Sequence, residues 1–289
     1  MWTRPWKYAE GFLIGGGLLA VGLALQFAFG PVEWKLLAFP VNMAVFLLFI
    51  TLVVLFYVFR KKVYVFEWMM HGHAAVSALA CAAMLTVLTG LIPQILSSWP
   101  FVLIYIWAVF ITGLAALNHL LRFRLREIPF VLNHLGVFLV LTCAALGSAD
   151  TRTLHMTVFE GSPEWRALDD EGVPVELDFT VELHRFSVDY YPDNTPRRFA
   201  SDVSVRTRDG EIVRHTLEVN KPLKVNGWQL YQYGYDALRG SDSPYSVLLL
   251  VRDPWLPAVY AGILMMLAGA LCLFVFMAPK PSAKEEDGI

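Results

Sequence analysis

Cysteine is scarce in this chain, and its three copies lie far apart. Cys81, Cys143 and Cys272 all fall inside long apolar stretches, and no two of them form a Cys-x-x-Cys pair. The polar part of the chain therefore has no disulfide framework. A thiol oxidoreductase is excluded because the reactive pair is missing. A c-type cytochrome is excluded because no Cys-x-x-Cys-His motif for haem attachment occurs.

Other short motifs of enzyme sites are missing as well. The sequence has no P-loop, no Gly-x-Ser-x-Gly, no His-Glu-x-x-His and no glycine-rich dinucleotide fingerprint. Its only glycine run, residues 15–17, is typical of close helix packing in membranes.

Charge is low and hydrophobic content is high. Charged residues make up 17% of the chain, hydrophobic residues 56%, and the mean hydropathy is +0.52. These values predict an integral membrane protein. A transmembrane helix needs about 20 mostly apolar residues, and the sequence has six such stretches. They are residues 11–30, 37–59, 74–95, 100–121, 129–147 and 255–277. We read the first as a retained helix, because it lacks a convincing cleavage site of small residues.

Lysine and arginine indicate how the helices are oriented, because they favour cytoplasmic segments. They lie before the first helix, after the second, after the fourth and after the sixth. These residues are Arg4, Lys7, Arg60, Lys61, Lys62, Arg122, Arg124, Arg126, Lys280 and Lys284. We therefore expect both termini, including a tail at 278–289, in the cytoplasm. Residues 148–254 are then extracytoplasmic.

The sequence pattern of the segment 148–254 predicts a folded, β-rich domain between the fifth and sixth helices. "PVELDFTVELHRFSVDYY" and "FASDVSVRT" alternate apolar with polar residues, which is the period of half-buried strands. Asp209-Gly210 and Asn226-Gly227 each predict a hairpin with a type I′ turn. The mild acidity of the segment gives no reason to expect a nucleic-acid partner.

Seven histidines are the main remaining candidates for functional residues. Five of them favour ordinary surface or loop roles: His71, His73, His155, His184 and His215. His119 lies near the cytoplasmic end of the fourth predicted helix, where its side chain can reach the interface.

His134 lies about a turn inside the fifth predicted helix, where an ionisable group is costly and often functional. The alternative to a functional role is a structural one, in which a neighbouring helix supplies the hydrogen-bond partner of the buried imidazole. His119 and His134 both follow an asparagine, in "LNHLL" and "LNHLG". Two histidines at one depth on adjacent helices can flank a planar cofactor such as haem.

Four stretches resemble the ResB family, also called CcsB, of System II cytochrome c biogenesis. They are "NHLGVFLVLTCAALGSAD", "LHMTVFEGSPEWRALDDEG", "VNKPLKVNGWQLYQYGYD" and "LLLVRDPW", within about residues 129–277. The resemblance implies a subunit of the bacterial cytoplasmic membrane that works with a CcsA or ResC partner. The complex takes haem b across the membrane and attaches it to Cys-x-x-Cys-His apocytochromes. His134 is implied as one axial ligand of the haem iron, and the partner supplies the other.

The sequence also departs from this family. Members more often have three helices before a larger outer domain, whereas five are expected here. The tryptophan-rich haem motif of the partner is missing, so the resemblance implies a subunit that is not catalytic alone. Arg122, Arg124 and Arg126 lie where haem propionates would enter, although topology alone explains their charge. "WQLYQYGY" is typical of a strand, or of a surface for the apocytochrome or the partner.

Two other functions fit the same residues. The chain can be a b-type electron-transfer subunit in which His119 and His134 bind one haem. It can also be a haem-free assembly scaffold or sensor whose β domain docks a partner.

Overall fold

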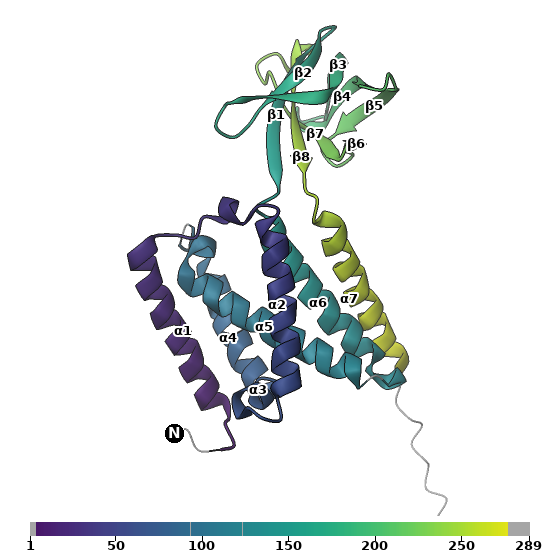
Figure 1. Ribbon diagram of the computed structural model, residues 1–289. Coiled ribbons are helices and arrows are strands. Elements are labelled where there is room, and N and C mark those ends of the chain that lie inside the picture. The colour runs from purple at the N-terminus through teal and green to yellow at the C-terminus, as the bar shows by residue number, and fades with distance from the viewer. Residues whose placement is uncertain (1–3, 93, 123, 277–289) are drawn as a thin grey trace, which may run out of the picture. The chain divides into compact units, whose positions relative to one another are not determined.

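The computed structural model describes residues 4–92, 94–122 and 124–276. The chain divides into two compact units, which we describe separately. The helical unit runs to Asp150 and resumes at Trp255, and the β unit is Thr151–Pro254. Figure 1 labels their helices and strands. The predicted tail at 278–289 and the last residue of the predicted sixth helix, residue 277, lie outside the described residues.

The helical unit holds seven α-helices among its described residues. They are α1 (Tyr8–Phe29), α2 (Val41–Phe59), α3 (Tyr64–Trp68), α4 (Gly72–Leu88), α5 (Trp99–Leu121), α6 (Ile128–Gly147) and α7 (Leu256–Phe276). Short 3-10 helices include η1 (Trp34–Leu37) and η3 (Leu125–Glu127). In the described part of the chain, five helices are long and apolar enough to cross a membrane, namely α1, α2, α5, α6 and α7. The chain is a multi-pass membrane protein.

The predicted third helix, 74–95, is wrong at its C-terminal end. The helix found there, α4, has 17 residues and ends at Leu88, so at 1.5 Å per residue it is roughly 26 Å long. The Thr89 hydroxyl donates to the carbonyl of Thr86 at 2.7 Å, which competes with the helical pattern, and Gly90 follows. Apolar residues continue beyond this stop, which is why hydropathy alone extended the helix.

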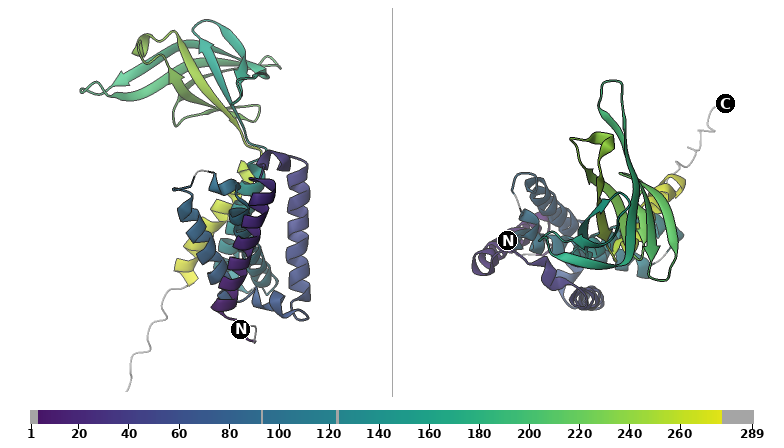
Figure 2. Two further views of the ribbon diagram at one scale, coloured as in Figure 1. Left: turned by 90° about the vertical axis from the view of Figure 1, so that its left-hand side faces the viewer. Right: turned by 90° about the horizontal axis from the view of Figure 1, so that it is seen from above.

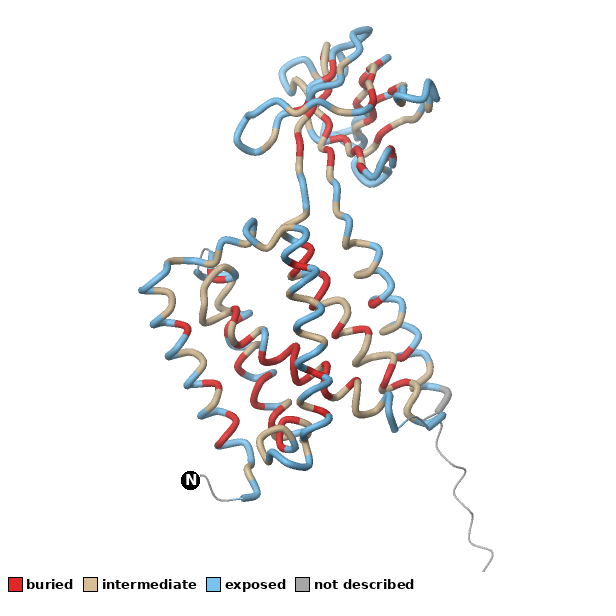
Figure 3. Tube along the Cα trace, in the orientation of Figure 1, coloured by how far each residue is buried: buried red, intermediate tan, exposed pale blue. Residues whose placement is uncertain are grey.

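Helix α5 forms the centre of the helical unit. It packs against α1, α4, α2 and α6, and Ile104, Trp107 and Leu114 are among its buried residues. Figure 3 shows the buried positions along its length, and Figure 2 shows the helices of this unit from two further sides. Helix α1 packs on α4 and α5, whereas α2 packs on α5 and α6.

Helices α6 and α7 pack closely against each other through small residues. A Cβ atom on Gly136 would lie 2.7 Å from the carbonyl oxygen of Gly262. A Cβ atom on Gly269 would lie 2.7 Å from Nδ2 of Asn133. Such close backbone approach is how helices associate within lipid, where burial of apolar surface gives no net gain.

At the end of α6 that leads into the β unit, the Asp150 carboxylate joins three segments of the helical unit. It accepts hydrogen bonds from the Phe39 N–H, from Nδ2 of Asn42 and from Nε1 of Trp255, each at 2.7 Å. Asn42 is fully buried and also donates to the carbonyl of Leu146 at 3.0 Å. Helices α2, α6 and α7 are thus fixed to one another at this end.

The β unit is one antiparallel sheet with the strand order β5-β4-β3-β2-β1-β8-β7-β6. Its strands are β1 (Arg152–Phe159), β2 (Pro163–Leu168), β3 (Pro174–Tyr190), β4 (Pro196–Thr207), β5 (Ile212–Glu218), β6 (Leu223–Val225), β7 (Trp228–Tyr235) and β8 (Tyr245–Arg252). Alternate residues of these strands form one apolar core, which includes Met156, Val181 and Leu248. Strands β4, β7 and β8 also meet through a buried polar cluster, in which Ser201 donates to Gln232 and lies 2.8 Å from the Ser246 hydroxyl. The β-rich character predicted for this segment is confirmed.

The two predicted type I′ hairpins have different outcomes. Asn226 and Gly227 both have positive φ, 48° and 81°, and they join β6 to β7, so this turn is confirmed. At Asp209-Gly210 only Gly210 has a positive φ, 86°. Its N–H donates to the carbonyl of Thr207 at 3.0 Å. The type I′ prediction is wrong there, because one more residue, Arg208, joins the loop and shifts the glycine to the left-handed position of a longer turn.

Candidate functional site

His134 is the seventh residue of α6 and is half-buried. Its Nδ1 atom lies 3.0 Å from the carbonyl oxygen of Phe130, one turn earlier. A carbonyl oxygen only accepts hydrogen bonds, so Nδ1 carries the proton. When the ring is neutral, Nε2 keeps its lone pair, which is the form in which imidazole binds a metal.

Phe130 links His134 to the neighbouring helix. The ring centroids of Phe130 and His134 are 3.7 Å apart with an interplanar angle of 11°. His119 of α5 lies 3.8 Å from the same phenyl ring, tilted by 32°. Two rings cannot share one face of a phenyl group at these distances, so the histidines lie on its opposite faces. The three rings form a His119–Phe130–His134 stack.

His119 is fixed by a carboxylate. Its Nδ1 atom lies 2.5 Å from Oε2 of Glu127 in η3, and both side chains are about one third exposed. An ionised carboxylate accepts a hydrogen bond from the Nδ1–H group, which orients the ring and leaves Nε2 free to act as a ligand. Both predicted histidines therefore have Nδ1 engaged.

The structure brings His119 and His134 to the same phenyl ring, but the two imidazole rings do not face each other directly. Phe130 occupies the space between their faces. Among the described residues, no group of three or more His, Cys, Asp and Glu side chains is placed to hold a metal ion. Sequence reasoning missed both Phe130 and Glu127. The spacing of Phe130, four residues before His134 on a helix, was the available signal.

The three predicted arginines lie close to the stack along the chain. Arg122 follows α5, Arg124 precedes η3 and Arg126 lies within it, and all three are exposed. None makes an ion pair with another described residue. The segment between α5 and α6 thus holds three exposed cations beside a histidine–carboxylate pair.

The aromatic strand "WQLYQYGY" is β7. Trp228 is buried in the core, whereas Tyr233 is 64% exposed and contacts His155 at a centroid distance of 4.9 Å. Of the other histidines in the β unit, His184 is exposed, and the Nε2 atom of His215 is buried without a partner among the described residues. The strand therefore supplies core on one face and one exposed aromatic side chain on the other.

Comparisons with known proteins bear on the same segment. The ResB-like family matches residues 122–243. The chain is 32% identical to the cytochrome c biogenesis protein CcsB of Gloeobacter violaceus over 129 residues, which are 42% of this chain and 27% of that protein. It is 34% identical to CcsB of Synechococcus elongatus over 108 residues, 35% of this chain and 24% of that protein. The matches thus span about a quarter of the length of these relatives.

A solved structure titled Cytochrome c Heme Lyase CcmF aligns with 96% of this chain and 47% of its own, at 16% identity and a TM-score of 0.41. The family match rests on the sequence alone. It begins before η3 and ends before β8, so it includes the His119 partner Glu127, the whole of α6 and most of the β unit. The resemblance to the ResB family is therefore confirmed over residues 122–243 of this chain.

Proposed function

We propose that this chain acts in cytochrome c biogenesis as a ResB-like membrane subunit that holds haem b through His134. The observation that carries the proposal is the hydrogen bond from Nδ1 of His134 to the carbonyl of Phe130, because it leaves Nε2 free for iron. The family match over residues 122–243 supports the role in cytochrome c biogenesis.

The half-buried position of His134 suits a ligand that is shared with a partner. An imidazole left partly uncovered in lipid is costly unless another group covers it. Within this chain the phenyl ring of Phe130 lies between the ring faces of His119 and His134. The second axial ligand in this proposal comes from a CcsA- or ResC-like subunit. Haem itself is the cargo, which the complex passes on to Cys-x-x-Cys-His apocytochromes.

Three arginines would complete this site. Arg122, Arg124 and Arg126 are exposed and without ion-pair partners among the described residues. Guanidinium groups pair well with carboxylates such as haem propionates. The arginines would hold the propionate edge of haem while His134 holds the iron.

The proposal includes an orientation in the bacterial cytoplasmic membrane. Residues 60–73 and 122–128 are cytoplasmic, and the β unit is extracytoplasmic. A reporter enzyme that works only outside the cytoplasm, inserted at Gly161 in an exposed turn, should be active. Activity of a cytoplasm-only reporter at the same site would overturn the orientation, and with it the depth assigned to His134.

Co-purification with spectroscopy separates the proposal from its two alternatives. The chain should carry strong haem absorption only when it is expressed together with its partner. A stable bis-histidine spectrum from the chain alone would favour the b-type electron-transfer subunit, in which Phe130 leaves the space between the histidines. Absence of haem with and without the partner would favour the haem-free scaffold.

A further inference from the structure

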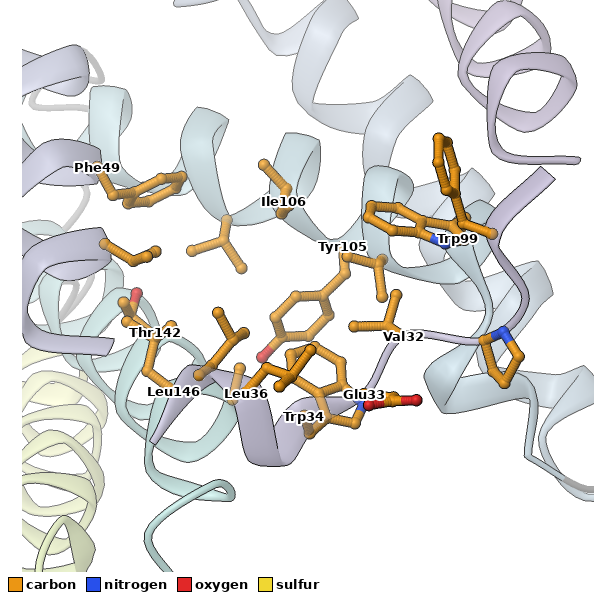
Figure 4. Close-up of a pocket in the computed structure, with 17 residues that line it drawn as sticks. Val32, Glu33, Trp34, Leu36, Phe49, Trp99, Tyr105, Ile106, Thr142 and Leu146 are labelled. Carbon is orange, nitrogen blue, oxygen red and sulfur yellow. The ribbon is translucent and has the colours of Figure 1, made fainter. Parts of the chain in front are cut away.

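The helical unit contains a cavity of about 650 Å³ that the haem proposal does not use. Its lining comes from the end of α1, from η1 and from α2, α5 and α6. Five aromatic side chains contribute to it: Phe29, Trp34, Phe49, Trp99 and Tyr105. Figure 4 shows Tyr105 in the middle of this lining, with Trp99 and Trp34 on either side of it. Its volume is within the range of ligand sites, about 300–1,000 Å³.

The charges around the cavity exclude several kinds of ligand. Among the described lining residues, Glu33 is the only charged one. There is no lysine or arginine for a phosphate or a propionate, and no histidine, cysteine or methionine for an iron atom. A carboxylate at the rim disfavours an anionic ligand. The cavity therefore suits a neutral molecule, and it is distinct from the site of His134.

The hydrogen bonds of the lining residues restrict further which ligands suit the cavity. The two hydroxyl groups of the lining already donate within the protein, from Tyr105 to the carbonyl of Leu141 at 2.8 Å and from Thr142 to that of Phe138 at 2.6 Å. The indole N–H of Trp99 is buried and has no acceptor among the described residues. A buried donor without an acceptor costs free energy. A ligand that carries a carbonyl oxygen brings an acceptor of the kind that this donor lacks.

The surroundings of the cavity favour a ligand from the bilayer. Helices α1, α2, α5 and α6 are all long enough to span a membrane, so hydrocarbon is the medium next to their outer faces. Aromatic walls bind planar rings through stacked and edge-on contacts. We propose that this cavity binds a neutral, ring-bearing lipid with carbonyl acceptors, of the quinone class. The inference does not rest on the haem proposal, because it uses neither His134 nor the partner.

The test uses the full chain in nanodiscs of phosphatidylcholine and an azido-substituted benzoquinone with a short apolar tail as a photolabel. We expect saturable labelling of peptides that contain Trp34 or Trp99, and competition by the same quinone without the azide. Ala145→Phe places a ring in the cavity and should reduce labelling about tenfold or more, since the space is filled. Ala144→Phe is the matched control: Ala144 is the preceding residue, is exposed and does not line the cavity, so labelling should be unchanged.

A second variant tests the hydrogen bond without filling the cavity. Trp99→Phe keeps an aromatic ring and removes the N–H, and it should weaken quinone binding about threefold to tenfold, as expected for one hydrogen bond. Unsaturable labelling, or equal labelling of Ala145→Phe and Ala144→Phe, would overturn the site. Displacement of the photolabel by diacylglycerol as effectively as by quinone would overturn the quinone class and indicate an acyl-lipid site.

Discussion

The carboxylate of Asp150 accepts a hydrogen bond from the indole Nε1 of Trp255 at 2.7 Å. These residues flank the β unit in the sequence, since Asp150 precedes its first residue and Trp255 follows its last. The same carboxylate accepts from the Phe39 N–H and from Nδ2 of Asn42. One acidic group therefore fixes the points where the chain leaves the helical unit and where it returns.

This relationship predicts the stability of two variants. Trp255→Phe keeps the ring packing and removes one hydrogen bond, so it should cost about 1 kcal/mol and lower the unfolding midpoint by about 2–4 °C. Asp150→Ala should lower it further, because three donors lose their acceptor. Thermal unfolding of the purified chain measures both. Trp165→Phe, at an exposed tryptophan of the β unit, is the control. Equal midpoints for Trp255→Phe and this control would contradict the role of the bond.

Two glycines with different surroundings, one in the α6–α7 contact and one in α1, predict opposite effects of substitution by alanine. A Cβ on Gly136 would lie 2.7 Å from the carbonyl oxygen of Gly262 and from Cγ of Met266. Gly136→Ala should therefore force the helices apart and cost about 1–3 kcal/mol. Around Gly16, in α1, a Cβ meets nothing within 4 Å, so Gly16→Ala should be neutral or stabilising by up to about 1 kcal/mol. The unfolding midpoints of the two variants are compared with that of the unchanged protein. A Gly136→Ala variant that is as stable as the unchanged protein would show that the helices are not in contact there.

The β unit should lose stability in acid through Glu218. Hydrogen bonds from Arg198, at 2.7 Å, and from Lys221, at 3.1 Å, hold the pKa of this carboxyl below its ordinary value of 4.5. A carboxyl whose folded pKa is lowered stabilises the fold above its unfolded pKa, and this contribution disappears as the pH falls through the folded pKa.

Glu218→Gln removes the titrating group. Between about pH 7 and pH 3 the variant should therefore lose less stability than the unchanged protein does. Thermal unfolding of the β unit within the full chain, followed by circular dichroism at both pH values, gives the comparison. Identical pH dependence of the two proteins would show that the ion pairs of Glu218 do not contribute.

The cysteines should be dispensable. Cys81 and Cys143 are buried in the helical unit, and all three cysteines are free. Replacing the three together by alanine should leave cytochrome c maturation largely intact, because none lies in the β unit to meet a client's thiols. Maturation is measured by haem staining of cytochromes in cells that depend on this chain. Its loss at a normal protein level would reveal a redox role.

Much of this fold was predictable because its signals are local. Long apolar stretches predicted the five helices of membrane-spanning length, and alternation predicted the β-rich unit. Asn226-Gly227 predicted its own turn because both residues tolerate positive φ. The end of α4 was missed because the apolar residues after Leu88 hide the competing hydroxyl of Thr89.

The candidate site was less predictable because it depends on contacts between helices. His119 and His134 were found as polar residues in apolar stretches, and the sequence allowed both to lie at one depth on adjacent helices. Phe130 between them was not, because ring stacking depends on how α5 packs against α6. The hydrogen bond from Trp255 to Asp150 joins residues 105 positions apart, and no local pattern predicts such a contact.

We propose that the imidazole of His134 binds haem iron, and imidazole rescue of the His134→Gly variant is the direct test. The variant removes the ligand and leaves a gap beside Phe130 that added imidazole can enter. Co-expressed with its partner, His134→Gly should lose both haem absorption and cytochrome c maturation, and added imidazole should restore part of both. His119→Gly is the matched control and should keep its haem. Full haem in His134→Gly, with loss of haem in His119→Gly, would show that His134 is not the ligand and would place the ligand on α5.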